Sequence, residues 1–304
     1  MERTPLLRVD GVLSKMKTIA TVLCLLVSSS VHAQQQVLES LERIERPPHA
    51  PATIGELAAR LHAVRASVIA VDWSTDSFVI PVAGNAAGSG GTYFRSDVVF
   101  NNDRLQSQPI AIGWMAQGQN NCSARLEYFV LSSNSITVAD DFVGVQLGKT
   151  GLGAVLVTSV TSNGAYDDDG EIDGYSRIWT RQPGSTGTVS QNFTAISVTD
   201  SIGSLPATLM GLKQSAAFRT NVGVVNFDTA AHTWTFRSIF NGTTTSVTVP
   251  PCSMTLTAAA NGSASGSGNV AFTVRSDGFG FWWSGFGSST DNVTGDGWVA
   301  RAIQ

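Results

Sequence analysis

One stretch of the chain gathers enough carboxylates to hold a metal ion. Within residues 163–174, Asp169, Glu171 and Asp173 are followed by Gly174, as in the first six positions of a calcium-binding loop. In such loops alternate residues supply oxygen ligands, and the glycine permits a sharp turn. The twelfth position is Thr180, which has no carboxylate for bidentate binding. Calcium bound by these three residues and an exposed, ion-free hairpin tip both remain open interpretations.

The remaining reactive side chains are few. Cys122 and Cys252 are separated by 130 positions, and a disulfide across such a loop stabilises a fold by up to about 5 kcal/mol in the chain-entropy model. Whether they pair depends on geometry that the sequence does not show. His49, His62 and His232 are scattered, and no Gly-x-Ser-x-Gly element surrounds a serine. We therefore expect no catalytic residues and a protein that is not an enzyme.

An aromatic run near the C-terminus has two interpretations. In an extended strand its side chains divide between two faces, so one set would fill a core. The other set would be exposed and could stack on a sugar ring or contact a neighbouring subunit. The run consists of Phe279, Phe281, Trp282, Trp283 and Phe286.

The elements that position these side chains are predicted to be mainly β-strands. From residue 68 onward apolar and polar residues alternate, as in residues 233–240, and turn residues recur at short intervals. The segment 94–101 resembles 218–226, with one residue of slack before the closing asparagine. We therefore expect an all-β fold of two tandem antiparallel sandwiches, at 70–200 and 201–304.

Two short helices interrupt this pattern. Thr53 and Glu56 form a capping-box signature before apolar residues at helical spacing, which predicts a helix over 54–65 within an N-terminal segment at 34–69. This helix would be either a strap over the β-structure or a docking element for a partner. A second helix is expected at 140–147, capped by Asp140.

The first residues read as an export signal. Lys17 precedes an apolar stretch at 19–27 and small residues that end at Ala33, which is typical of a secretory signal peptide. We expect cleavage after Ala33, with residues 1–15 as an upstream extension. The apolar stretch is shorter than a membrane-spanning helix, so no membrane span is expected in the mature chain.

The charge balance argues against nucleic acid as a partner. The chain of 304 residues has 19 Lys and Arg against 23 Asp and Glu, a formal net charge of −4. Its 30 glycines and 10 prolines suit strands joined by tight turns. Binding to a phosphate backbone needs a basic surface that this composition does not supply.

Several segments together resemble a known kind of protein. These are Ile80 to Gly84, Gly91 to Asp97, Ala217 to Asn226 and Asp291 to Asp296. As a set they resemble a functionally uncharacterised family of exported bacterial proteins with tandem immunoglobulin-like repeats. The resemblance covers residues 77–300 and implies immunoglobulin-like sandwiches, a bacterial source and export, but no reaction.

The function that follows is that of a non-catalytic exported protein. We expect a structural, adhesive or binding module of the cell envelope, the periplasm or the extracellular space. Its partner would be a surface glycan or another envelope protein, with the ligand-binding residues unknown and no cofactor beyond the calcium considered above. A carbohydrate-binding module is the alternative, and an uncharacterised hydrolase comes third.

Overall fold

The computed structural model covers the whole chain and describes most of it. The described residues are 37–39, 41–67, 76–88, 91–182, 184, 186–198, 206–260, 268–278 and 281–304. The chain divides into two compact units, Met1–Val37 and Leu38–Gln304. The first holds almost none of the described residues, so the predicted signal peptide at 1–33 lies outside them.

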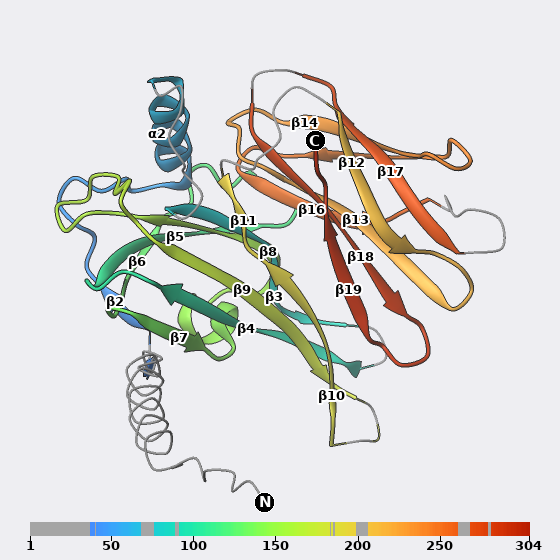
Figure 1. The fold of residues 1–304 in the computed structure, drawn as a ribbon, viewed down its shortest axis with the longest axis horizontal. Coiled ribbons are helices and arrows are strands. Elements are labelled where there is room, and N and C mark those ends of the chain that lie inside the picture. The colour runs from blue at the N-terminus through green and yellow to red at the C-terminus, as the bar shows by residue number, and fades with distance from the viewer. Residues whose placement is uncertain are drawn as a thin grey trace, which may run out of the picture. The chain divides into compact units, whose positions relative to one another are not determined.

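The fold is dominated by antiparallel strands, which confirms the expected all-β class (Figure 1). The strands up to residue 197 are β1 (Val37–Glu39), β2 (Glu42–Ile44), β3 (Ser77–Ala87), β4 (Tyr93–Asn102), β5 (Gln108–Ala116), β6 (Glu127–Leu131), β7 (Ser135–Ala139), β8 (Gly151–Ser159), β9 (Ile172–Arg181), β10 (Thr188–Thr194) and β11 (Ile196–Ser197). The later strands are β12 (Ala207–Lys213), β13 (Phe218–Asn226), β14 (His232–Ser238), β15 (Thr244–Val249), β16 (Ser253–Ala258), β17 (Asn269–Ser276), β18 (Trp283–Asp291) and β19 (Gly297–Arg301). We call β3 to β11 the N-terminal β half and β12 to β19 the C-terminal β half.

The two halves pair their strands in the same order. The N-terminal β half has two runs of hydrogen-bonded strands, β3-β8-β5-β6 and β7-β4-β9-β10. The two runs are joined where the end of β3 pairs with the start of β4. In the C-terminal β half, the four-stranded sheets are β12-β17-β14-β15 and β16-β13-β18-β19. Each strand from β3 to β10 therefore has a counterpart nine strands later in the chain, at the same place in the strand order of its half.

The immunoglobulin-like part of the expected fold class is not confirmed. In an immunoglobulin constant domain the first, second, fifth and fourth strands share one sheet. Here the first strand of each half pairs with the sixth, and the second strand lies in the other run with the fifth and seventh. The alternation of side chains predicts strands and two faces, but it does not determine which strands become neighbours.

Apolar side chains from both runs fill the core of each half. In the C-terminal β half, Leu209, Val224, Trp234 and Trp283 come from four strands of the two sheets and are fully buried together. The N-terminal β half has its own core, which extends to residues on the outer face of β13, β16 and β18. The same sheet thus packs inward on its own core and outward on the N-terminal β half.

One buried asparagine has the same role in each half. The Asn102 Oδ1 atom accepts a hydrogen bond from the amide of residue 104, and its Nδ2 donates to the carbonyls of residues 106 and 132. Asn226 bonds in the same way to the amide of residue 228 and to the carbonyls of residues 230 and 250. The segments 94–102 and 218–226 therefore align without the residue of slack that the sequence suggested.

Helix α2 (Ile54–Ser67) follows the N-terminal segment. The Thr53 hydroxyl accepts a hydrogen bond from the amide of Glu56 at 3.2 Å, and the Glu56 carboxylate accepts one from the amide of Ala52 at 2.7 Å. Ile54 and Leu61 are buried in the core of the N-terminal β half, and the His62 ring lies 5.0 Å from that of Trp282. The helix therefore contacts both β halves, as a strap would.

The second predicted helix differs in type and in its cap. Phe142–Gln146 forms one turn of π-helix, and Asp141 rather than Asp140 precedes it, in a left-handed conformation with φ 45°. Its side chain makes no capping hydrogen bond. Phe142 and Val143 are buried, so apolar packing positions this turn.

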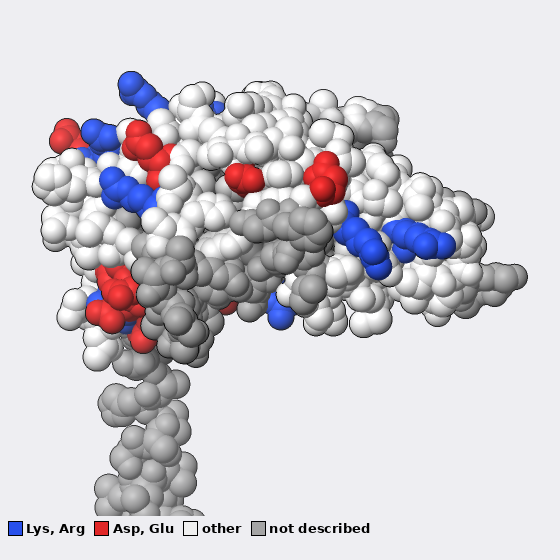
Figure 2. Space-filling model, turned by 90° about the horizontal axis from the view of Figure 1, so that it is seen from above, with Lys and Arg blue, Asp and Glu red and all other residues white. Residues whose placement is uncertain are grey.

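Charged side chains are sparse on the surface. Figure 2 shows one face of the molecule, on which acidic and basic groups lie near one another in small clusters on a mostly uncharged surface. A continuous basic surface of the kind that binds nucleic acid is not seen on this face.

Candidate functional site

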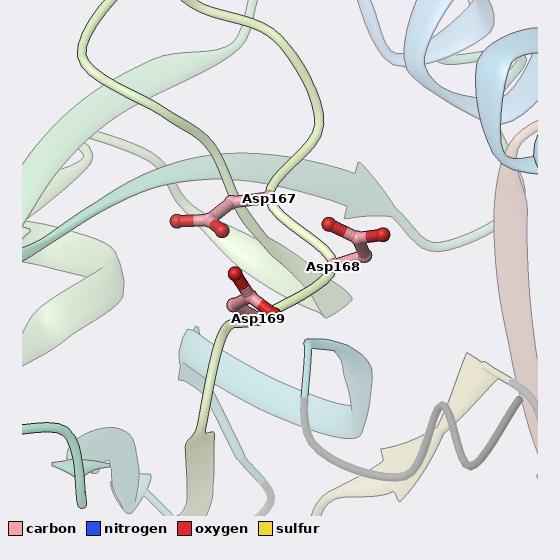
Figure 3. Close-up of side chains that lie close together, drawn as sticks. All are labelled: Asp167, Asp168 and Asp169. Carbon is pink, nitrogen blue, oxygen red and sulfur yellow. The ribbon is translucent and has the colours of Figure 1, made fainter.

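The acidic loop before β9 holds a carboxylate cluster, but not the predicted one. Carboxylate oxygens of Asp167, Asp168 and Asp169 lie within 4.8 Å of one another on one turn (Figure 3). Among the described residues, Glu171 and Asp173 do not join this group. Both are exposed on the extended chain that enters β9, where alternate residues stand roughly 6.6 Å apart. The predicted Asp169, Glu171 and Asp173 set is therefore not brought together around one point.

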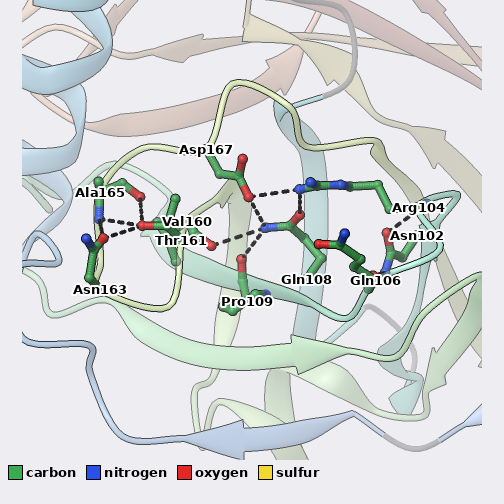
Figure 4. A network of polar contacts seen from close by, with 10 residues as sticks. All are labelled: Asn102, Arg104, Gln106, Gln108, Pro109, Val160, Thr161, Asn163, Ala165 and Asp167. Atoms are coloured by element: carbon green, nitrogen blue, oxygen red, sulfur yellow. Dashed lines mark hydrogen bonds and ion pairs between the residues drawn. The ribbon is translucent and has the colours of Figure 1, made fainter.

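Asp167 already has two partners. Its carboxylate lies 2.9 Å from Nη1 of Arg104 and accepts a hydrogen bond from Nε2 of Gln108 at 3.1 Å (Figure 4). Gln108 is fully buried and also donates to the carbonyl of Val160, while its Oε1 accepts from Arg104. The network ties the loop to the start of β5. Arg104 thereby neutralises one of the three clustered charges, which lowers the need for a cation.

A buried acid lies close to this network. Asp76 is 2% exposed, and Tyr166 donates a hydrogen bond to its Oδ2. Oδ1 has no hydrogen-bond partner among the described residues. Burial raises the pKa of Asp76 to about 6, although the hydrogen bond from Tyr166 acts in the opposite direction. Burial and the neighbouring Asp76 also raise the pKa of the Tyr166 hydroxyl.

Cys122 and Cys252 are joined by a disulfide, with their Cα atoms 5.1 Å apart. The bond links the loop after β5 to the turn before β16, so it crosses between the two β halves. Hydrogen bonds accompany it: Asn121 donates to the carbonyl of Cys252, and the amide of Gly118 donates to that of Met254. One end of the contact between the halves is therefore closed.

The aromatic run near the C-terminus is mostly core. Phe281, Trp283 and Phe286 are at most 4% exposed. Trp282 is half-buried beside His62, and Phe279 lies outside the described residues. These rings do not form an exposed platform for a sugar among the described residues.

The other end of the contact between the halves opens into a cleft of about 570 Å³. Its walls come from β3, β4, β8, β9 and β10 on one side, and from β13, β16, β18 and the turn after β18 on the other. Phe94, Ile178 and Leu256 supply apolar surface, while Thr92, Ser190 and Asn221 supply polar groups. A mainly preformed hollow with a few convergent polar groups is the usual form of a small-ligand site.

Two charged residues stand at the rim of the cleft. The Arg219 guanidinium is exposed and donates to Oδ1 of Asn292 at 2.9 Å, and it has no acidic partner among the described residues. Asp291 accepts hydrogen bonds from the amides of Val293 and Thr294 at 2.7 and 3.1 Å. These backbone donors lower the pKa of the Asp291 carboxyl, which keeps it ionised.

No known protein family, curated protein or solved structure matches this chain. Among the helices that the structure describes, none is both long and apolar enough to cross a membrane.

Sequence reasoning missed the cleft, Asp76 and the Arg104 network. The cleft joins residues from 82 to 295, which no local pattern connects. Asp76 shows no signal beyond being a single acid before an apolar strand. The repeated Phe-Arg-x-Asx segment was a usable signal, because it places Arg219 and Asn221 on one strand face.

Proposed function

We propose that the protein is a non-catalytic, exported binding module built from two tandem β-sandwich repeats. It would act in the cell envelope or outside the cell, after removal of residues 1–33. The observation that carries the proposal is the Cys122–Cys252 disulfide between the two halves. Disulfides persist in oxidising compartments such as the periplasm and the extracellular space, and are rare in the cytosol.

The repeat relation is supported by the equal strand order of the halves and by Asn102 and Asn226, which bond alike. The two halves do not carry the same surface, however. The outer face of the β16-β13-β18-β19 sheet packs on the N-terminal half at the disulfide and leaves the cleft at the other end. A rigid pair of sandwiches with a hollow between them favours binding over a purely structural role.

A non-catalytic role is favoured by how the acids are engaged. Asp167 is paired with Arg104, and Asp228 lies 2.7 Å from Nε2 of His232. That hydrogen bond lowers the pKa of Asp228 although partial burial opposes it. Neither of these carboxylates lines the cleft, so neither is placed to exchange a proton with a ligand bound there.

Glycan-array screening tests this proposal together with its carbohydrate-binding alternative. We expect the purified, disulfide-bonded protein to bind one class of glycan without releasing sugar over hours of incubation. Sugar release that follows protein concentration would show an enzyme and overturn the non-catalytic proposal. Binding that is equal for all arrayed glycans would argue against a selective binding module.

A further inference from the structure

The two halves differ at one set of equivalent positions. In the N-terminal β half, Arg177 lies 3.6 Å from Asp97, and Arg95 lies 3.4 Å from Asp141. The amide of Asp141 also donates to Asp97 at 3.2 Å. These two ion pairs lie beside β4 and β9 and are linked through that backbone amide. Each charge there has an opposite charge beside it.

Among the described residues of the C-terminal β half, the corresponding positions carry no ion pair. Arg219 and Asn221 on β13 stand where Arg95 and Asp97 stand on β4. The residue paired with Asn221 on β18 is Ser288, whereas Asp97 is paired with Arg177 on β9. A neutral amide thus stands in place of an acid, and a small serine in place of an arginine. Arg219 has no carboxylate partner among the described residues, and the smaller serine leaves room beside Asn221.

That room is part of the cleft, because Arg219, Asn221 and Ser288 all line it. The Asn221 amide makes no hydrogen bond to another described side chain or backbone group, so its donors and its acceptor are directed to the cleft or to solvent. Thr290, opposite Arg219 in the strand register, adds a hydroxyl. Amide and hydroxyl groups that both donate and accept suit a ligand rich in hydroxyls.

We propose that this cleft binds a saccharide that carries a carboxylate, with Arg219 as the anchor for the acid group. The inference rests on the proposed binding function and names its ligand class. A guanidinium binds a carboxylate through two parallel hydrogen bonds, and this pairing is stronger than one between neutral groups. The Asn221 amide faces the sugar hydroxyls. The half-buried ring of Phe94 offers an apolar surface to the C–H face of a sugar ring.

The ionised Asp291 limits the ligand to few acid groups. Asp291 lies at the same rim, and a second carboxylate beside it would be repelled. A sugar hydroxyl can instead donate to it. The rim thus accommodates one acid group at Arg219 and hydroxyls elsewhere.

Calorimetric titration with 3′-sialyllactose, a trisaccharide with a single carboxylate, and with the neutral trisaccharide 3′-galactosyllactose tests the proposal. The wild-type protein is expected to bind the acidic trisaccharide at least tenfold more tightly than the neutral one. Arg219→Gln should weaken binding of the acidic trisaccharide at least tenfold and leave the neutral one within twofold. Raising the salt concentration should weaken the binding of the acidic trisaccharide only, since dissolved ions screen charge pairs at an exposed rim.

Arg237→Gln is the matched control. Arg237 is an exposed arginine on β14, outside the cleft, and has no ion-pair partner among the described residues. Its replacement removes the same charge and should leave both affinities within twofold, with melting temperatures of both variants equal to the wild type. Equal weakening by both variants would reduce the effect to net charge and overturn the proposal.

Two further results separate this inference from the proposed function. If Arg219→Gln leaves the affinity for the acidic trisaccharide unchanged, the proposed ligand class is wrong. The proposed binding function is then decided by the glycan-array result alone. If a folded protein binds neither trisaccharide, the saccharide proposal is overturned. Export and the disulfide are tested independently of this result, by mass spectrometry of the protein from its native host.

Discussion

At the residue scale, corresponding positions in the two halves hold polar networks of different chemistry. Arg104 and Gln108 reach Asp167 in the N-terminal β half. The positions 124 residues later are Asp228 and His232, and His232 lies 3.3 Å from Asp277. Each network ties the start of a strand to the loop after the sixth strand of its half. The acidic loop is therefore held by contacts that need no ion.

Calcium should not change the stability of the folded protein. Asp167 is paired with Arg104, and the chain geometry keeps Glu171 and Asp173 out of the carboxylate cluster. We expect melting curves with millimolar calcium and with chelator, at constant ionic strength, to coincide. A bound ion at 100 times its dissociation constant would add about 2.7 kcal/mol. A calcium-dependent rise that Asp169→Asn with Asp173→Asn abolishes would restore the calcium interpretation.

Asp76 makes stability depend on pH. Its carboxyl has a pKa of about 6 in the folded protein against 3.8 for the free group, so the folded state binds more protons between these values. Stability therefore falls as pH rises from about 4 to above 6, by about 1–3 kcal/mol. Asp76→Asn keeps an acceptor for Tyr166 and removes the charge. We expect this variant to be more stable than wild type at pH 8, with little difference at pH 4, in urea unfolding at both pH values.

A constant difference between the two proteins at every pH would contradict this assignment. Tyr166→Phe is the companion variant, because it removes the hydrogen bond that the Tyr166 hydroxyl donates to Asp76 Oδ2. That hydrogen bond lowers the pKa of Asp76, so its removal should make stability fall more steeply as the pH rises.

At the element scale, most strands were predictable because their side chains alternate between a buried and an exposed face. Polarity does not predict the buried face of β7, because Ser135 and Thr137 are buried there while Val138 is 38% exposed. The strand at 233–240 was drawn too long: it ends at Ser238, and Phe240 is 49% exposed in the following turn. Strand neighbours and the cleft could not be predicted, because they depend on contacts between distant segments.

The repeat relation predicts that Asn102 and Asn226 are equally important. Each alanine substitution removes at least three hydrogen bonds and leaves buried backbone groups without a partner. Such groups cost about 1–3 kcal/mol each, so both variants should lose more than about 2 kcal/mol in chemical denaturation. Gln119→Ala, at an exposed site, should change stability by less than about 0.5 kcal/mol. A large loss at one asparagine and none at the other would contradict the shared role.

At the scale of the whole molecule, the disulfide and the apolar contact make the two halves act as one body. The bond closes a loop of 130 residues, which in the chain-entropy model contributes up to about 5 kcal/mol. The double variant Cys122→Ser with Cys252→Ser should have a free energy of unfolding several kcal/mol lower than the wild type. It should also bind any ligand that spans the cleft less tightly. Proteolysis and calorimetry of the variant follow both effects. Unchanged stability would show that the apolar contact alone holds the halves together.

We propose that this is an exported protein, and its halves are joined by a disulfide. Mass spectrometry of the protein isolated from its native host, after blocking free thiols and without reduction, tests this proposal most directly. We expect a chain that begins at or near Gln34, recovered outside the cytosol, with Cys122 and Cys252 joined in one cross-linked peptide. A chain that begins at Met1 in the cytosol with both thiols blocked would contradict it.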